Sequence, residues 1–194
     1  MEPIDVAFSG PFSWLGADDA PSIFLSEDGQ RAGIYLWTVP RPGGHLIYYV
    51  GETGRTFEGR LVEHYKEHAS GFYHLYSPSE FANGEKRLVW PGRYDRHDRR
   101  SDVDCIGQYA QLTTCITELT KLYRFHLAPL ELDTRLRRRV EAAIALWLYD
   151  VGGEVGAFQD KDIHFEPRLP SEEPVVCNVR SRVPLLGLPD RLLA

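Results

Sequence analysis

Two short runs rich in aromatic and β-branched residues predict neighbouring strands near the start of the chain. Residues 33–39 read GIYLWTV and residues 46–51 read LIYYVG, compositions typical of strands. Residues 40–45, PRPGGH, separate them, and such breakers end one strand and reverse the chain. The pattern therefore predicts an antiparallel hairpin.

Each predicted strand carries a tyrosine that shares a face with a glycine. Side chains alternate between the two faces of a strand, which places Tyr35 on the side of Gly33 and Tyr49 on the side of Gly51. A glycine leaves backbone uncovered beside each ring. The hairpin thus offers two tyrosines with open space around them.

A helix is expected directly after the hairpin. Thr56 is suited to cap its N-terminus, and the apolar periodicity continues to about Ala69. Arg60 and His64 are four residues apart, so their side chains lie one above the other on a flank of this helix. Both side chains are therefore able to point back over the hairpin.

Two longer helical patterns follow, after a third strand that we expect near residues 86–90. One pattern runs from about residue 103 to residue 126, and the other from Asp133 or Thr134 to about Val151. A pair of glycines, 152–153, ends the second helix. These elements complete a mixture of strands and helices.

Glu141 is the unusual residue of the second helix. It lies beside the predicted core face, in a window from Val140 to Tyr149 that is otherwise apolar. A carboxylate in such surroundings needs a cation or hydrogen-bond donors. The helix itself offers an ordinary alternative, an ion pair with Arg137 or Arg138 one turn away. Glu141 is the candidate metal ligand of the chain.

The strings GIY at 33–35 and YVG at 49–51, followed by Arg60, His64 and Glu141, resemble the signature of the GIY-YIG endonuclease family. That resemblance implies metal-dependent hydrolysis of DNA phosphodiesters. It also implies an α+β fold in which a small antiparallel sheet is flanked by helices. The similarity is continuous over residues 33–64 and resumes at Glu141, with an insertion between the motif helix and the metal-ligand helix.

The resemblance assigns a role to each motif residue. Tyr35 would orient or deprotonate the attacking water with help from His64, and Tyr49 would lie beside the scissile phosphate. Arg60 would bind the phosphate through its planar fork of donors. Glu141 would hold one Mg²⁺ or Mn²⁺ ion. Gly33 and Gly51 belong to the structural motif and carry no chemistry.

Three positions complicate the match. The family often has lysine or a small polar residue where this chain has Glu52, whose charge would repel a phosphate. Arg60 stands one residue farther from Gly51 than usual, so Arg55 is a rival for the arginine role. Asn178 corresponds loosely to a later asparagine of the family.

The chain has the size of a single domain. We expect 194 residues to form one nuclease domain with an N-terminal extension (1–31), the core motif (33–69), an insertion (70–102) and a C-terminal tail (163–194). Three cysteines without a CxxC pair favour reduced thiols over a disulfide framework. No apolar stretch is long enough for a membrane span and no secretion signal is recognisable, which predicts a cytoplasmic protein without a membrane partner.

The distribution of charge bears on the DNA-binding prediction. The formal net charge is −6, which is unfavourable for phosphate contact. Residues 86–139, however, hold twelve Lys or Arg against seven Asp or Glu, a local balance of +5. The predicted DNA contacts are Arg93, Arg96, Arg99, Arg100, Arg137 and Arg138. The alternative is that the arginines of the last helix simply form the solvent-exposed start of that helix.

Three functions remain open at this stage. The first is a stand-alone endonuclease of the restriction or defence type, which would act as a homodimer on a symmetric DNA site. The second is a nucleic-acid-binding module that kept the fold without efficient chemistry. The third is a protein-interaction domain that uses the proline-containing segment 167–189.

Overall fold

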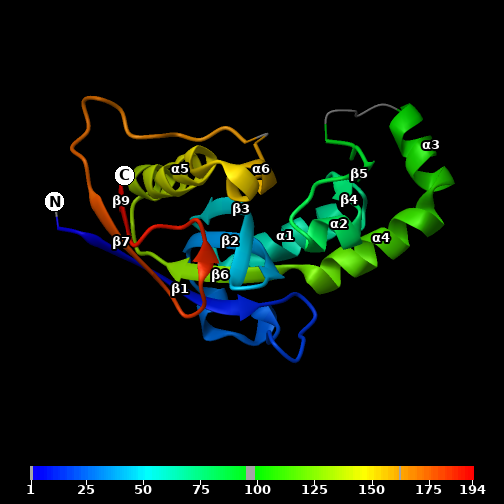
Figure 1. Ribbon diagram of the computed structural model, residues 1–194, viewed down its shortest axis with the longest axis horizontal. Helices are drawn as coiled ribbons and strands as arrows, with labels where there is room; N and C mark the ends of the chain where they lie inside the picture. Colours follow the sequence, from blue (N-terminus) through cyan, green and yellow to red (C-terminus); the bar gives the residue numbers. More distant parts are fainter. Residues whose placement is uncertain (1, 95–98, 162) are drawn as a thin grey trace.

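The computed structural model describes residues 2–94, 99–161 and 163–194. A seven-stranded sheet forms its centre, in the order β8-β3-β2-β6-β1-β7-β9 (Figure 1). Its strands are β1 (Ile4–Phe12), β2 (Gly33–Arg41), β3 (Gly44–Thr53), β6 (Arg124–Pro129), β7 (Val176–Ser181), β8 (Leu185–Leu186) and β9 (Arg191–Leu193). A separate two-stranded ribbon consists of β4 (Leu75–Tyr76) and β5 (Leu88–Trp90).

Six α-helices and two 3₁₀ turns are described. The helices are α1 (Phe57–Ala69), α2 (Pro78–Ala82), α3 (Arg99–Gly107), α4 (Tyr109–Leu122), α5 (Thr134–Val151) and α6 (Gly153–Phe158). The turns are Ile23–Leu25 and Glu27–Gln30. No helix among these described residues is long and apolar enough to cross a membrane.

The prediction of a small antiparallel sheet is wrong. The sheet has seven strands and is mixed, since β1 runs parallel to β7 and β3 runs parallel to β8. Residues 4–12 and 176–193, which were expected to be an extension and a tail, supply β1, β7, β8 and β9. Ile4 of β1 pairs with Cys177 of β7, and His45 of β3 pairs with Leu185 of β8. Local sequence patterns do not encode pairings between segments so far apart in the chain.

The predicted hairpin is confirmed, and its register places Tyr35 opposite Gly51 and Trp37 opposite Tyr49. The strand expected near residues 86–90 does not join the sheet of the hairpin. Residues 88–90 pair with β4, and β6 lies against β2 instead. The predicted helix over 103–126 merges α3, α4 and the start of β6, because the buried residues of β6 continued its apolar pattern.

Two apolar clusters lie on opposite faces of the central strands. One cluster contains Tyr35 and Trp37 of β2 and includes residues of α1 and α4. The other contains Ile34 and Leu36 and includes Val140 and other residues of α5. The alternation predicted for β2 thus determines which helices cover which face. Thr56 caps α1 and Asp133 caps α5, as expected.

Candidate functional site

Four of the predicted site residues meet on the α1 face of the hairpin. The Tyr35 hydroxyl is fully buried and lies 2.7 Å from Nε2 of His64. Arg60 Nε donates a hydrogen bond of 3.4 Å to the same hydroxyl. The ring of Tyr49 stacks on that of Tyr35 with a centroid distance of 5.9 Å. Arg60 and His64 lie on consecutive turns of helix α1, and both side chains point toward the tyrosines, as their spacing predicts.

A chain of hydrogen bonds continues from His64 to the end of α1. Nδ1 of His64 lies 2.8 Å from the Tyr73 hydroxyl, and that hydroxyl donates to the Glu67 carboxylate. Because Tyr73 uses its proton on Glu67, it accepts the Nδ1 proton of His64. Nε2 of neutral His64 is then the acceptor for Tyr35. The bonds therefore run in one direction, from Tyr35 through His64 and Tyr73 to Glu67.

Burial favours the uncharged forms of Tyr35, His64 and Tyr73. It lowers the pKa of His64 to about 3, with a further contribution from the positive charge of Arg60. Burial also raises the pKa of Tyr35 well above its ordinary value, and Tyr49 adds to that shift. The pKa of Tyr73 is raised by burial and by its bond to Glu67. At neutral pH these hydrogen-bonded side chains can therefore relay a proton without any of them becoming positively charged.

Gly51 leaves the space that the two tyrosine rings occupy. A Cβ at this position would lie 2.4 Å from Cζ of Tyr35 and 2.6 Å from Cε1 of Tyr49. Both distances are far below van der Waals contact, so any side chain here must displace a ring. The glycine of the YVG string is thereby explained by packing.

Replacing Gly51 by alanine is expected to destabilise the fold by about 1–3 kcal/mol, the usual cost of overpacking. Urea unfolding checks this, with Gly107→Ala as the control because a Cβ at Gly107 meets nothing within 4 Å. Equal unfolding midpoints for the two variants would show that the rings of Tyr35 and Tyr49 are not held by this glycine.

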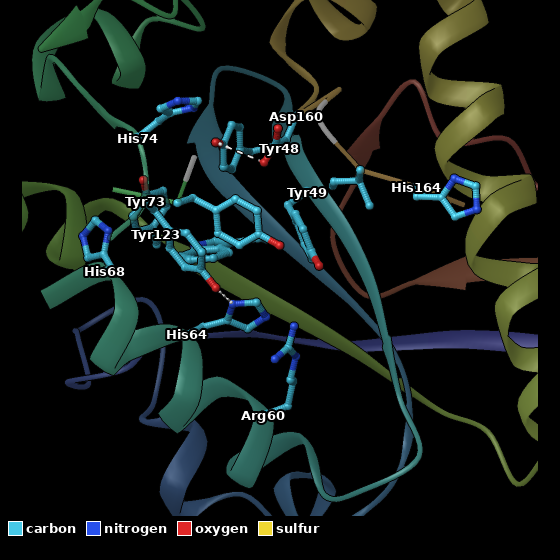
Figure 2. A pocket seen from close by; sticks show the side chains of 13 residues that line it. Tyr48, Tyr49, Arg60, His64, His68, Tyr73, His74, Tyr123, Asp160 and His164 are labelled. Carbon is cyan, nitrogen blue, oxygen red and sulfur yellow. Dashed lines mark hydrogen bonds between the residues drawn. The ribbon is translucent and has the colours of Figure 1, made fainter. Parts of the chain in front are cut away.

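A cavity of about 310 Å³ opens beside the cluster. Its lining residues are Trp37, Tyr48, Tyr49, Arg60, His64, His68, Tyr73, His74, Tyr94, Tyr123, Asp160, Ile163 and His164. Figure 2 shows the polar ends of Tyr49, His64 and Arg60 directed toward one another at one side of it. Tyr35 does not line the cavity, because Tyr49 stacks over its ring.

Glu141 approaches the cluster from the other face of the sheet. Helix α5 packs on the face opposite Tyr35, and β8 pairs with β3 only at His45 and Leu46. Among the described strands, the outer edge of β3 is therefore unpaired from Tyr49 onward. There the Glu52 backbone N–H bonds Glu141, and the Glu141 charge contributes to raising the pKa of Tyr49. Glu141 thus sits at an open strand edge beside Tyr49.

The Glu141 carboxyl is poorly compensated. Burial raises its pKa to about 7, and the negative charge of Glu52 adds to the shift. The alternative predicted from sequence, an ion pair of Glu141 with Arg137 or Arg138, is absent from the described part of the chain. Both arginines bind Glu52 instead, at 2.5 Å and 3.5 Å.

The partners of Glu52 remove an objection to phosphate binding at this site. Glu52 was expected to repel a phosphate, yet two guanidinium groups contact its carboxylate. Arg137 is buried and holds it most closely. The charge of Glu52 is thus partly balanced by Arg137 and Arg138, although it still raises the pKa of Glu141.

Two tentative site residues lie elsewhere. Arg55 is exposed and binds Glu63 at 2.7 Å, while Arg60 binds the same carboxylate at 3.1 Å and also reaches Tyr35. Arg60, not Arg55, therefore occupies the arginine position of the cluster. Asn178 lies on β7 and donates a hydrogen bond to Asp5 of β1. Strand β7 is three strands away from β2, which is about 14 Å at ordinary strand spacing.

The arginines predicted to contact DNA are largely engaged within the protein. Arg93 binds Asp102 at 2.6 Å, and Arg138 binds Glu166 at 2.5 Å in addition to Glu52. Arg137 is buried on Glu52. Arg96 lies outside the described residues, and Arg99 and Arg100 begin α3 without described side chains. The three described arginines of this set are thus paired with carboxylates of the protein.

Sequence reasoning missed two members of the hydrogen-bond chain. Glu67 follows His64 by three residues on α1, a spacing that could have identified it. Tyr73 comes after the helix has ended, and no sequence pattern places its hydroxyl on His64. No protein-family model, curated protein or solved structure matches this chain.

Proposed function

We propose that this protein is a metal-dependent endonuclease that hydrolyses phosphodiester bonds in DNA. The observation that supports this most strongly is the convergence of Tyr35, Tyr49, Arg60 and His64, with Glu141 at the adjoining edge of β3. Phosphodiester hydrolysis needs a proton acceptor, a cation for the phosphate and a site for a divalent ion. These residues supply groups for all three needs, and they are the ones that resemble the GIY-YIG signature.

Arg60 and Tyr49 are the groups available to a phosphate, because both line the cavity. Arg60 uses Nη1 on Glu63 and Nε on Tyr35. These two bonds fix the guanidinium plane and leave further N–H donors for phosphate oxygens. The Tyr49 hydroxyl would bind a second phosphate oxygen.

Proton transfer would follow the hydrogen-bond chain. As the water oxygen bonds to phosphorus and the bond to the leaving sugar oxygen breaks, one water proton goes to the Tyr35 oxygen. The Tyr35 proton moves to Nε2 of His64, the Nδ1 proton moves to Tyr73, and the Tyr73 proton moves to Glu67. His64 stays neutral throughout, which its low pKa requires. Because Tyr49 covers Tyr35, substrate binding has to shift the Tyr49 ring.

The residues at the edge of β3 fit a divalent cation. A half-buried carboxyl with a raised pKa, close to a second carboxylate, is stabilised by positive charge. The described residues contain no group of three His, Cys, Asp or Glu side chains that could hold a metal, but Mg²⁺ commonly binds through one or two carboxylates and several waters. Glu141 would hold the ion. When bound, it would stabilise negative charge on the phosphate and the leaving oxygen.

One observation favours a second candidate, a nucleic-acid-binding module without cleavage: the proposed proton acceptor, Tyr35, is fully buried. Incubating supercoiled and single-stranded DNA with Mg²⁺ or Mn²⁺ separates the two. Nicking or cleavage that disappears in Tyr35→Phe and Glu141→Ala supports the enzyme. Retention of DNA at low salt without any product supports the binding module.

Replacing Tyr73 by phenylalanine is expected to slow cleavage about 10- to 100-fold, within the range of general-base effects, and to leave DNA affinity unchanged. Without the hydroxyl, His64 has to become a cation, so the loss should be largest near pH 7 and shrink at higher pH. Cleavage rates between pH 6 and 9 check this. Tyr65→Phe on the exposed side of α1 is the control, and matching profiles for the two variants would rule out the Tyr73 route.

A further inference from the structure

The cavity beside the cluster is walled by aromatic rings. Six of its lining residues are tyrosine or tryptophan: Trp37, Tyr48, Tyr49, Tyr73, Tyr94 and Tyr123. Its volume of about 310 Å³ is at the lower end of the range for small-molecule sites, roughly 300–1,000 Å³. Such a space admits one flat group and excludes a stack of several.

Two buried polar atoms belonging to the wall lack partners. Nε1 of Trp37 and Nε2 of His68 make no hydrogen bond within the described residues, although their side chains are only 4% and 1% exposed. His68 bonds the Ile116 backbone, which leaves Nε2 as an acceptor, while the indole N–H is a donor. Burial lowers the pKa of His68 to about 4, so the ring is neutral. Both atoms have almost no accessible surface in this structure, so they are polar groups of the wall that other protein atoms cover.

We propose that this cavity binds one unstacked nucleobase of the DNA strand to be cut. A nucleobase is flat, stacks on aromatic rings, and presents donors and acceptors along its edge. The indole N–H of Trp37 and Nε2 of His68, which are covered in this structure, would each bind one such edge atom after neighbouring rings shift. Arg60 lies in the same wall, where it would hold the phosphate next to that base.

This assignment rests on the proposed nuclease function and defines its substrate class. A base that is paired and stacked in a duplex cannot enter an aromatic cavity of this size. The substrate would therefore be single-stranded DNA, or DNA with an unpaired nucleotide at the cleavage site. The ion pairs of Arg93, Arg137 and Arg138 with carboxylates of the protein agree with this class, because these three arginines are not free to bind the phosphates of a duplex.

The test uses three versions of one oligonucleotide: single-stranded, fully paired, and single-stranded with one abasic nucleotide. Each is assayed for cleavage with Mn²⁺. Binding is measured separately, in EDTA, with a single strand that carries 2-aminopurine. The fluorescence of this base falls when it stacks on an aromatic ring. Tyr94→Ala removes a wall residue that is 65% exposed, so the variant should keep the fold. Tyr109→Ala, 61% exposed on α4 and outside the cavity, is its matched control.

The expected result is quenching by the wild-type protein and cleavage of the single strand at least about tenfold faster than of the duplex. Cleavage of the abasic strand should stop at the abasic position. Tyr94→Ala should weaken binding about tenfold, as the loss of one stacking ring predicts, and Tyr109→Ala should not.

The two proposals fail in different ways. Equal cleavage of all three oligonucleotides overturns the base site and leaves the nuclease function standing. Quenching that Tyr94→Ala weakens, without cleavage of any oligonucleotide, supports the base site and overturns the nuclease. Absence of both quenching and cleavage overturns both.

Discussion

Replacing Glu141 by glutamine is expected to abolish metal-dependent cleavage and, at the same time, to stabilise the folded protein at pH 8. The amide keeps the shape of the side chain but is a poor ligand for Mg²⁺, so cleavage should fall at least about 100-fold. The gain in stability has a separate cause. Burial and the charge of Glu52 raise the pKa of Glu141 to about 7, so its ionised form destabilises the fold.

The pH dependence of this gain follows from linkage. A carboxyl with a raised pKa in the folded state adds stability that is present below its unfolded pKa, near 4.5, and is lost as pH rises through about 7. Each pKa unit is worth about 1.4 kcal/mol, and partial exposure reduces the total, so Glu141→Gln should gain about 1–3 kcal/mol at pH 8 and little at pH 4.5.

Urea unfolding at both pH values and a cleavage assay with Mn²⁺ check this pair of effects. Asp150→Asn is the control, because it changes an exposed carboxylate at the other end of α5. A Glu141→Gln protein that cuts at the wild-type rate contradicts the proposed metal position. A Glu141→Gln protein that is no more stable than wild type at pH 8 contradicts the conclusion that the Glu141 carboxyl is poorly compensated.

The second large effect is a loss of stability in mild acid. Burial lowers the pKa of His64 and His126 to about 3 and that of His68 to about 4, all from an ordinary 6.5. A depressed histidine pKa adds stability that is present above the unfolded pKa and is lost as pH falls through the window from 6.5 toward 3. At pH 5 each of these histidines should therefore cost about 2 kcal/mol relative to pH 7.5.

Glu141 works in the opposite direction over the same window and offsets about one of the three histidines. The net expectation is a loss of several kcal/mol between pH 7.5 and pH 5, measured by urea unfolding, with a steeper loss in Glu141→Gln. His126→Gln should flatten the profile, because it removes one of the three buried histidines. A stability that does not change between these pH values would refute the assignment of buried neutral histidines.

Local structure was predictable because its signals lie close together in the sequence. The hairpin follows from two β-rich runs around a proline and glycine turn, and α1 and α5 follow from apolar periodicity and the caps Thr56 and Asp133. The meeting of Tyr35 with His64 also follows, since strand alternation and helix spacing fix both directions. These short-range rules were therefore sufficient to predict the residues at the centre of the candidate site.

Long-range pairing was beyond those rules. The alternating residues of β6 continue the apolar pattern of α4, so the pattern alone does not separate strand from helix. The position of Glu141 depends on β8 covering only one end of β3, which exposes the edge next to Tyr49. Asn178 was assigned from order along the chain, whereas its strand pairs with β1 and β9 far from the hairpin.

The central claim is that water attacks a DNA phosphorus at the Tyr35, His64 and Glu141 site, and isotope transfer tests it most directly. Single-stranded oligonucleotide is cut by the purified protein with Mn²⁺ in ¹⁸O-labelled water, and the phosphate-bearing product is weighed by mass spectrometry. The account predicts one ¹⁸O atom on that phosphate, and no product from Glu141→Gln or in EDTA. Product that carries no ¹⁸O, or labelled product formed equally by Glu141→Gln, would contradict it.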